Sequence, residues 1–153
     1  MTKIILKNME DTEKLARILA KETDEKLLLT LSGDLATGKT TFTKYFAKHL
    51  GIKDTVNSPT FNILKEYTTD KINFYHIDAY RLENSEEDLG FEEIFYENNI
   101  CVIEWAEFIE DFLPRERLSI KIQFNNDLRE VTIFSKGEYY EKLERNLIEQ
   151  WLA

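Results

Sequence analysis

A glycine-rich turn between an apolar run and an amphipathic stretch constrains this chain more than any other feature. Residues 26–31 read Lys-Leu-Leu-Leu-Thr-Leu, and such a run is typical of a parallel strand covered on both faces. Residues 33–40 follow at once and match the pattern Gly-x-x-x-x-Gly-Lys-Thr. A helix is expected to follow through about Leu50, with Gly51 placed to end it. This order of elements predicts a P-loop, and an ordinary glycine-rich turn is the alternative.

The spacing within this loop suits phosphate binding for physical reasons. The two glycines allow the backbone to approach a phosphate group because no Cβ stands in the way. Successive backbone N–H groups line an anion-binding concavity, and the following helix points its positive N-terminal end at the same place. Lys39 is expected to reach the β- and γ-phosphates of ATP, and the Thr40 hydroxyl to bind Mg²⁺. The residues predicted to bind the nucleotide here are Gly33, Asp34, Leu35, Ala36, Thr37, Gly38, Lys39, Thr40 and Thr41.

Two acids stand where a metal-binding carboxylate is expected. Glu104 ends the apolar run 100–103, and Asp78 ends the run 74–77. In a doubly wound sheet, the carboxyl ends of neighbouring parallel strands open toward the bound ligand. Either carboxylate could hold Mg²⁺ directly or through water, or orient the attacking water; a solvated strand end or a helix cap is the alternative for each. His76 has no evident partner in the sequence and is expected to be structural.

The segment after the expected P-loop helix carries two more hydroxyl groups. Residues 57–61 read Asn-Ser-Pro-Thr-Phe, and many P-loop proteins place a segment that senses the γ-phosphate at this point. Ser58 or Thr60 could supply a hydroxyl to the nucleotide. Ser-Pro-Thr by itself is typical of an ordinary turn, so both interpretations stay open.

Hydrophobic periodicity gives the remaining elements and the fold class. The first helix is expected to be capped by Asp11 or Thr12. The expected elements are a strand at 3–7, a helix at 11–22, strands at 60–68 and 72–80 joined by a turn at 70–71, a short helix within 85–98, a buried strand at 99–105, a hairpin of 118–124 and 129–134, and an amphipathic C-terminal helix at 137–152. We therefore predict a single P-loop NTPase-like α/β domain over residues 1–153, with three layers and a mixed sheet that has a parallel centre and antiparallel additions.

Charge and cysteine content argue against several classes of protein. The formal net charge is −9 and the basic residues are scattered among acids, whereas proteins that bind nucleic acid by themselves carry basic patches. Tight direct binding of RNA or DNA is therefore not expected. Cys101 is the single cysteine, so neither an intramolecular disulfide nor a cysteine-based zinc site is expected. No signal-peptide region and no run of ~20 apolar residues is evident, and a cytoplasmic location is predicted.

Several short motifs, in order along the chain, resemble the bacterial TsaE (YjeE) family. They are Leu-Ser-Gly-Asp-Leu at 31–35 with Gly-Lys-Thr-Thr at 38–41, Ser-Pro-Thr-Phe at 58–61, His-Ile-Asp-Ala-Tyr-Arg-Leu at 76–82, Gly-Phe-Glu-Glu at 90–93, and Val-Ile-Glu-Trp at 102–105. The resemblance covers roughly residues 5–135. It implies a small ATPase that is required for threonylcarbamoyladenosine modification of transfer RNA, binds ATP with Mg²⁺ and hydrolyses ATP slowly. It also implies a TsaB–TsaD complex as partner, through which tRNA is reached and in which TsaD transfers threonylcarbamoyl to adenosine 37.

The resemblance also implies roles for particular residues. Lys39 would contact phosphate, and Thr40 and Glu104 would surround Mg²⁺. Asp78 would be a catalytic or water-orienting acid, and the choice of catalytic base between Asp78 and Glu104 stays open. Trp105 is expected to line the nucleotide site or a partner surface.

Two positions depart from the family pattern. The family loop usually reads Gly-Asp-Leu-Gly-Ala-Gly-Lys-Thr, whereas Ala36 and Thr37 stand here in place of Gly-Ala. Alanine is disfavoured wherever φ must be positive, so the loop is expected to be strained or reshaped if this position needs a positive φ. Ala106 stands where the family often has proline, a change expected to be mild. Residues 58–60 match the family and would form a switch-like loop.

Two functions other than an ATPase subunit stay open. A small-molecule P-loop kinase would need lid arginines and an acceptor pocket, and of the six arginines only Arg81, Arg115 and Arg117 are expected near the site edges. A non-enzymatic nucleotide-dependent switch or assembly factor would respond to binding alone. GTP specificity is not expected, because no Asn-Lys-x-Asp base-reading sequence is present.

Overall fold

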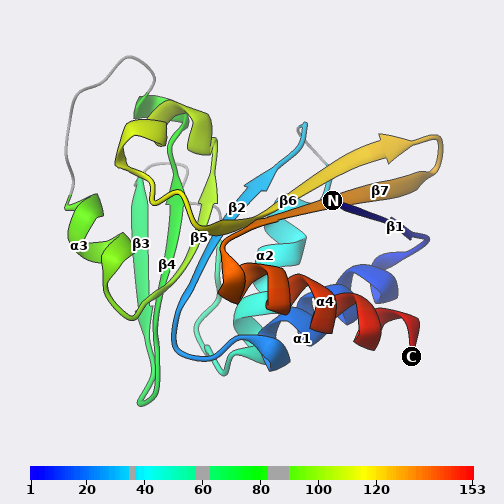
Figure 1. Cartoon of the computed structure of the whole chain (residues 1–153), viewed down its shortest axis with the longest axis horizontal. Coiled ribbons are helices and arrows are strands. Elements are labelled where there is room, and N and C mark those ends of the chain that lie inside the picture. Colours follow the sequence, from blue (N-terminus) through cyan, green and yellow to red (C-terminus); the bar gives the residue numbers. More distant parts are fainter. Residues whose placement is uncertain (35–36, 58–62, 83–89) are drawn as a thin grey trace.

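The structure is a computed structural model that describes residues 1–34, 37–57, 63–82 and 90–153. Within these residues, one seven-stranded sheet runs in the order β1-β7-β6-β2-β5-β4-β3 (Figure 1). Its strands are β1 (Thr2–Leu6), β2 (Leu27–Ser32), β3 (Leu64–Thr68), β4 (Asn73–Asp78), β5 (Ile100–Glu104), β6 (Arg117–Asn125) and β7 (Leu128–Lys136). β6, β2, β5 and β4 are parallel to one another, whereas β1, β7 and β3 pair antiparallel with their neighbours. The predicted mixed sheet with a parallel centre and antiparallel additions is confirmed.

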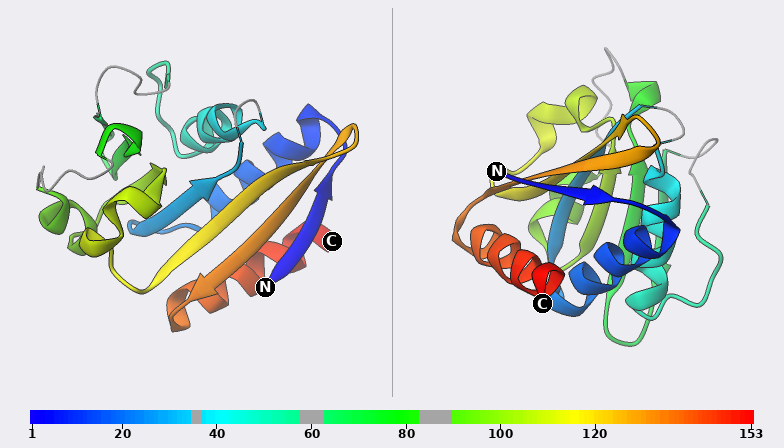
Figure 2. Two further views of the ribbon diagram at one scale, coloured as in Figure 1. Left: turned by 90° about the horizontal axis from the view of Figure 1, so that it is seen from above. Right: turned by 90° about the vertical axis from the view of Figure 1, so that its right-hand side faces the viewer.

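Helices cover both faces of this sheet. The helical elements are α1 (Met9–Glu22), α2 (Lys39–His49), α3 (Phe91–Tyr96), α4 (Glu138–Leu152) and two 3₁₀ segments, η1 (Tyr80–Leu82) and η2 (Ala106–Phe112). α1 lies between α2 and α4 and contacts both, and these three helices cover one face (Figure 2). η2 lies at the opposite face, where it and Thr30, Ser119 and Phe134 line one hollow. α3 packs against η2 through the rings of Phe91 and Phe112, whose centroids are 5.7 Å apart.

Two buried central strands bring the ends of three strands to one edge of the sheet. Every residue of β5 is buried, and β2 is buried up to its last residue except for the half-buried Thr30. Such strands need apolar side chains on both faces, which explains their continuous apolar runs. Leu31 of β2 and Asp78 of β4 both pair with Glu104 of β5. The glycine loop therefore leaves β2 beside the two acids that end β4 and β5.

The β6–β7 hairpin is longer than the sequence pattern indicates. Its strands extend to Asn125 and Leu128, which pair directly, so that only Asn126 and Asp127 form the turn. Asn126 has a left-handed φ of 57°, a conformation that asparagine tolerates and that two-residue hairpin turns require. This tight turn sets the register that carries the first residues of β7 over the glycine loop.

The first helix begins earlier than expected. α1 starts at Met9, and the Asn8 side chain accepts a hydrogen bond from the backbone N–H of Asp11 at 2.9 Å. Asn8 is therefore the N-cap, and the expectation of Asp11 or Thr12 at this position is wrong. The Asp11 carboxylate instead accepts from the backbone N–H of Lys7 at 2.8 Å, outside the helix.

Other boundaries shift for local reasons. The strand expected at 72–80 ends at Asp78, because the chain turns into η1 two residues later. β3 begins at Leu64, and the first part of the strand expected at 60–68 lies outside the described residues. The same holds for residues 85–89 of the region expected to contain a short helix, in which α3 begins after Gly90.

The C-terminal helix packs on the sheet through an apolar side and a tyrosine. Leu143 and Leu147 of α4 are buried, and the hydroxyl of Tyr140 accepts a hydrogen bond from the backbone N–H of Leu28 at 2.9 Å. Glu144 bonds the hydroxyls of Thr2 and Ser135, each at 2.6 Å. Among the described residues, the chain has no helix with the length and apolar character needed to cross a bilayer.

Candidate nucleotide site

The loop between β2 and α2 turns at two glycines whose conformations few other residues adopt. φ is 145° at Gly33 and 104° at Gly38. A Cβ built on Gly33 would lie 2.3 Å from the carbonyl oxygen of Ile122 in β6, so two backbones pass each other there with no room for a side chain. Gly38 is the left-handed N-cap residue of α2. The two glycines of the motif therefore allow the close approach and the helix start that a phosphate cradle needs.

Thr37 makes two hydrogen bonds within the loop. Its hydroxyl donates to the carbonyl oxygen of Asp34 at 2.8 Å, and its backbone N–H donates to the same oxygen at 3.3 Å. Alanine, which the family pattern has at this position, could not make the hydroxyl bond. Leu35 and Ala36 lie outside the described residues, and strain or reshaping at Ala36 stays a prediction.

Arg129, in β7, holds the carbonyl side of the same loop. Its Nε donates to the carbonyl oxygen of Thr37 at 2.7 Å, and its guanidinium carbon lies 5.2 Å from the centroid of the Phe124 ring. Arg129 and Phe124 are cross-strand partners in the β6–β7 hairpin. A single sequence carries no signal for this contact, because it depends on the register of two strands far from the loop.

The arginines expected near the site edges are arranged differently. Arg117 is paired with Glu110 at 2.6 Å and also donates to the carbonyl of Pro114. Arg115 lines a pocket with Lys26, the residue before β2, and thus lies at the end of that strand opposite to the glycine loop. The expectation for Arg115 is therefore wrong, and the expectation that only three arginines lie near the site missed Arg129.

The first turn of α2 presents its polar groups to the loop. Lys39, Thr40 and Thr41 begin this helix, and the first N–H groups of a helix have no intrahelical acceptor. Phe42 and Phe46 are completely buried on the other side of the helix and hold it in the core. The fixed helix therefore directs free N–H donors and the positive end of its dipole toward the place where phosphate is expected.

Glu104 meets Lys39 at the end of β5. Lys39 Nζ lies 3.7 Å from Oε1 of Glu104, and the two side chains are only 9% and 6% exposed. Nζ is also 5.1 Å from the centroid of the Trp105 ring. Three residues predicted for the nucleotide site are thus in mutual contact, although they come from two separate parts of the chain.

His76 holds the other oxygen of the same carboxylate. Its Nε2 lies 2.9 Å from Oε2 of Glu104, and the histidine side chain has no exposed surface. The expectation that His76 lacks a partner is therefore wrong. The alternation of a strand could have indicated the contact, because His76 and Asp78 share one side of β4 and Asp78 pairs with Glu104.

Asp78 lies at the end of β4, and one of its carboxylate oxygens accepts a hydrogen bond. It is half-buried, and its Oδ1 accepts a hydrogen bond from the backbone N–H of Tyr80 at 3.0 Å. The carboxylate thus caps the turn into η1, which agrees with the helix cap named above as the alternative role for this acid. Its position opposite Glu104 in the β4–β5 register still brings both acids to the same sheet edge.

Three aromatic rings, the site aromatic cluster of Tyr80, Trp105 and Phe108, contact one another, and Trp105 lies beside Lys39. Trp105 stacks on Phe108 at a centroid distance of 5.8 Å, and Tyr80 meets Trp105 edge-on at 5.2 Å. Trp105 has a left-handed φ of 57°, which turns the chain sharply from β5 into η2. Tyr80 is 58% exposed, so the cluster reaches from the buried lysine to the surface. The sequence predicts Trp105 at this site but not its two ring partners.

The described residues fit a Mg²⁺–nucleotide complex by their chemistry. They contain no group of three or more His, Cys, Asp or Glu side chains that could hold a metal by themselves. Mg²⁺ bound with a nucleotide does not need such a group, because it takes oxygens from phosphate, water and one or two side chains. Thr40 and Glu104 are the side chains that could supply the protein oxygens of such a complex. Ser58 and Thr60, also predicted to bind the nucleotide, lie outside the described residues.

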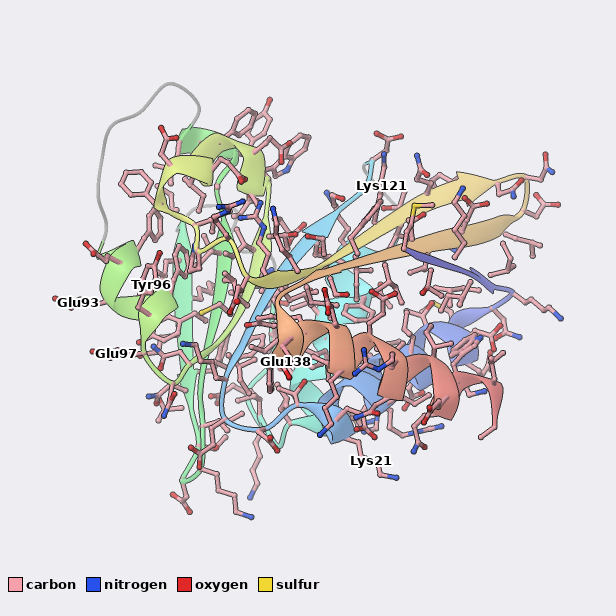
Figure 3. The ribbon with its side chains drawn as sticks, viewed as in Figure 1. Lys21, Glu93, Tyr96, Glu97, Lys121 and Glu138 are labelled. Atoms are coloured by element: carbon pink, nitrogen blue, oxygen red, sulfur yellow. The ribbon has the colours of Figure 1, made fainter. Side chains whose placement is uncertain are left out.

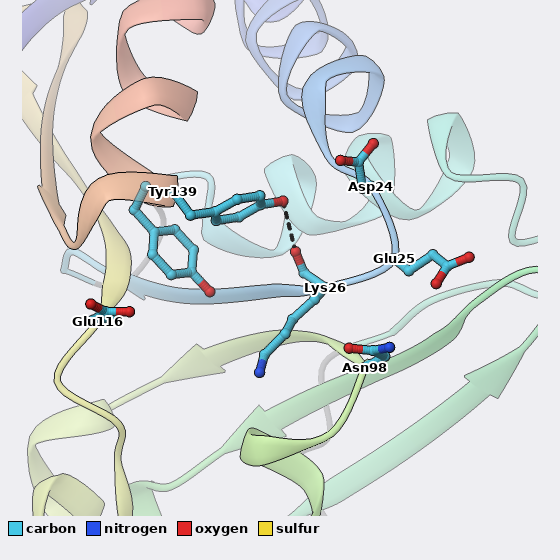
Figure 4. Close-up of a pocket in the computed structure, with 7 residues that line it drawn as sticks. Asp24, Glu25, Lys26, Asn98, Glu116 and Tyr139 are labelled. Carbon is cyan, nitrogen blue, oxygen red and sulfur yellow. Dashed lines mark hydrogen bonds between the residues drawn. The ribbon is translucent and has the colours of Figure 1, made fainter.

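A separate pocket lies away from this site. A pocket of about 570 Å³ is found at the amino end of β2 (Figure 4), lined by Asp24, Glu25, Lys26, Asn98, Glu116, Tyr139 and Tyr140. The Tyr139 hydroxyl donates to the carbonyl oxygen of Lys26 at 3.0 Å. The glycine loop leaves the opposite end of the same strand, so this pocket plays no part in the candidate site.

Comparison with known proteins agrees with the geometry. The sequence profile of the family described as "Threonylcarbamoyl adenosine biosynthesis protein TsaE" matches residues 6–131. The tRNA threonylcarbamoyladenosine biosynthesis protein TsaE of Bacillus subtilis (strain 168) is 48% identical over 137 residues, covering 89% of this chain and 87% of that protein. The protein of the same name from Treponema pallidum (strain Nichols) is 35% identical over 132 residues, covering 84% of this chain and 97% of that protein.

A solved structure extends the agreement to the fold. The crystal structure of Bacillus subtilis YdiB matches with a TM-score of 0.82 and 40% sequence identity, covering 97% of this chain and 94% of that one. The expected P-loop NTPase-like α/β class is therefore confirmed. The profile, the relatives and the solved structure each align along most of the chain. This chain belongs to the TsaE family of tRNA threonylcarbamoyladenosine biosynthesis proteins.

Proposed function

We propose that this chain binds ATP with Mg²⁺ and hydrolyses ATP slowly, as a subunit that acts with a TsaB–TsaD-type complex. The observation that carries the proposal is the contact between Lys39 and Glu104, at 3.7 Å, beside the glycine loop. A cation suited to phosphate and a carboxylate suited to metal stand together only because α2 begins where β5 ends. This arrangement supports nucleotide chemistry over simple anion binding, for which the carboxylate would be unfavourable.

Each polar group of the site has a role in this proposal. Lys39 and the first N–H groups of α2 bind the phosphates, and Arg129 holds the loop through the carbonyl oxygen of Thr37. Thr40 and Glu104 hold Mg²⁺, which would neutralise charge on the β- and γ-phosphates when bound. Asp78, or Glu104 through water, orients the attacking water molecule.

The surface charge supports an indirect route to tRNA. The net charge is −9, and exposed acids such as Glu93 and Glu97 lie around α3 (Figure 3). Phosphate-rich RNA is repelled by such a surface. We therefore propose that a protein complex brings the chain to tRNA, in the cytoplasm, and that the chain binds tRNA weakly or not at all by itself.

ATP turnover and tRNA modification test this proposal together. The purified protein should hydrolyse ATP slowly alone and faster with TsaB and TsaD. Lys39→Ala should weaken ATP binding about 10-fold or more, because a charged hydrogen bond contributes about 1.5–3 kcal/mol, and should abolish modification in cells that lack the wild-type gene. Lys44→Ala, an exposed lysine of the same helix, is the matched control. Unstimulated turnover together with normal modification by Lys39→Ala would overturn the proposal.

A nucleotide-dependent switch without required hydrolysis is a second candidate. One observation favours it: both Glu104 oxygens and Oδ1 of Asp78 are already engaged with protein groups. A general base needs a free lone pair directed at the water molecule. A Glu104→Gln variant that binds ATP, does not hydrolyse it and still supports modification would select the switch.

A further inference from the structure

His76 is a completely buried histidine whose polar contact is with one carboxylate. Its Nε2 lies 2.9 Å from Oε2 of Glu104, and its Nδ1 has no hydrogen-bond partner within the described part of the chain. A carboxylate can only accept, so Nε2 must carry the proton in this contact. An unpartnered buried nitrogen costs free energy, which a purely space-filling residue at this position would not incur.

The contact fixes the orientation of the Glu104 carboxylate group. Oε2 is occupied by His76, and Oε1 is the oxygen that lies 3.7 Å from Lys39 Nζ. Rotation about the last side-chain bond is soft in a glutamate, so neither oxygen would keep its place without such a donor. β4 and β5 are parallel neighbours with Asp78 opposite Glu104, which places His76, two residues earlier in β4, beside the carboxylate.

We propose that His76 is the positioning residue of Glu104 and presents a single carboxylate oxygen, Oε1, to the nucleotide site. His76 itself touches neither nucleotide nor metal. The inference rests on the proposed function, because the direction of Glu104 matters where a Mg²⁺–nucleotide complex binds. Donors behind a metal-binding side chain typically change metal affinity or activity 10- to 100-fold when they are removed.

Two substitutions separate this role from simple packing. The side-chain amide of His76→Gln keeps an N–H donor for Glu104, whereas His76→Leu fills the space and has no donor. A packing role predicts that leucine is tolerated at least as well as glutamine in this buried position. A positioning role predicts the opposite order for Mg²⁺ affinity.

The nucleotide-free protein gives the first readout. The chain has two histidines, His49 and His76, so long-range ¹H–¹⁵N spectra of the wild type and of His49→Gln assign both rings. We expect the proton of His76 on Nε2, and its signals should move in Glu104→Gln. A proton on Nδ1 alone, or a spectrum unaffected by Glu104→Gln, would overturn the contact on which the proposal depends.

Metal binding gives the second readout, without catalysis. In a Trp151→Phe background, Trp105 is the single tryptophan and lies directly after Glu104, so its fluorescence follows Mg²⁺ titrated in the presence of ADP. His76→Gln should stay within about 3-fold of wild type, whereas His76→Leu should need 10- to 100-fold more Mg²⁺. ADP affinity without Mg²⁺ should change little in either variant.

The outcomes distinguish the positioning role of His76 from the proposed ATPase function. Equal Mg²⁺ affinity in folded His76→Leu and His76→Gln would overturn the positioning role and leave the proposed ATPase function intact. Failure of the wild type to bind ADP at all would overturn the proposed function instead, and the spectra of the nucleotide-free protein would still report on the His76–Glu104 contact. If His76→Leu does not fold, those spectra and the behaviour of His76→Gln decide the matter.

Discussion

Lys39 and Glu104 form a buried ion pair in the place where phosphate and metal are proposed to bind, with Nζ 3.7 Å from Oε1. Both side chains are less than one-tenth exposed. A phosphate group would attract the lysine, and a metal ion would attract the carboxylate. The pair therefore has to separate, or share its charges with the ligand, when a nucleotide binds.

Mutual dependence of these two charges is expected before any ligand is added. Removing one partner of a buried pair leaves an uncompensated charge, whereas removing both does not. We expect Lys39→Met and Glu104→Gln each to lower the free energy of unfolding. The double variant should lose less than the sum of these two losses, with a coupling of about 0.5–3 kcal/mol. Denaturant unfolding of the four proteins without nucleotide measures this, and additive effects would show that the pair contributes nothing.

A side chain at the first glycine of the loop should disrupt the site. In Gly33→Ala the added Cβ would lie 2.3 Å from the backbone oxygen of Ile122, so β6 or the loop must move, and we expect a loss of about 2 kcal/mol or more in unfolding free energy together with loss of ATP binding. Gly51→Ala is the matched control, because φ is also positive there but no atom lies within 4 Å of the added Cβ. Equal thermal stability of the two variants would contradict this reading of the loop.

Arg129 should influence nucleotide affinity although it lies in a distant hairpin. Arg129→Ala removes the bond from Nε to the Thr37 carbonyl, and we expect ATP affinity to fall about 3- to 10-fold because the loop is held less firmly. Arg129→Lys should not restore it, since a lysine cannot reproduce the planar guanidinium. Calorimetric titration with ATP measures the change, and Arg17→Ala, an exposed arginine of α1, controls for lost charge. Wild-type affinity in Arg129→Ala would contradict the prediction.

Alkaline pH should destabilise the fold through its buried cysteine. Burial raises the pKa of the Cys101 thiol from 9.0 to about 12, so above pH 9 the unfolded chain loses this proton while the folded chain keeps it. The stabilisation from this group is complete below pH 9 and falls as pH rises through 12, by about 1 kcal/mol between pH 9 and pH 10. Unfolding at both pH values should show this loss in the wild type relative to Cys101→Ala. Equal slopes in the two proteins would contradict a buried thiol.

Local patterns sufficed for the parts of the site that are contiguous in sequence. The glycine spacing, Lys39 at the start of a helix and the apolar runs before Glu104 and Asp78 each depend on neighbours within a few residues. The same short-range patterns indicate the order of most helices and strands. They do not select the cap of α1, because Asn8, Asp11 and Thr12 are all chemically suitable and only the backbone path selects one.

Contacts between segments that are far apart in the sequence could not be predicted from local patterns. Arg129 bonds the glycine loop because an Asn126–Asp127 turn sets the hairpin register. His76 finds Glu104 because β4 and β5 are adjacent and parallel. The sequence by itself determined that a glycine-rich turn joins β2 to α2 and that Lys39 begins this helix, since those depend on short-range spacing. Only the tertiary structure decided which donors hold the loop and the carboxylate, because strand register over long separations is set by the packing of the whole sheet.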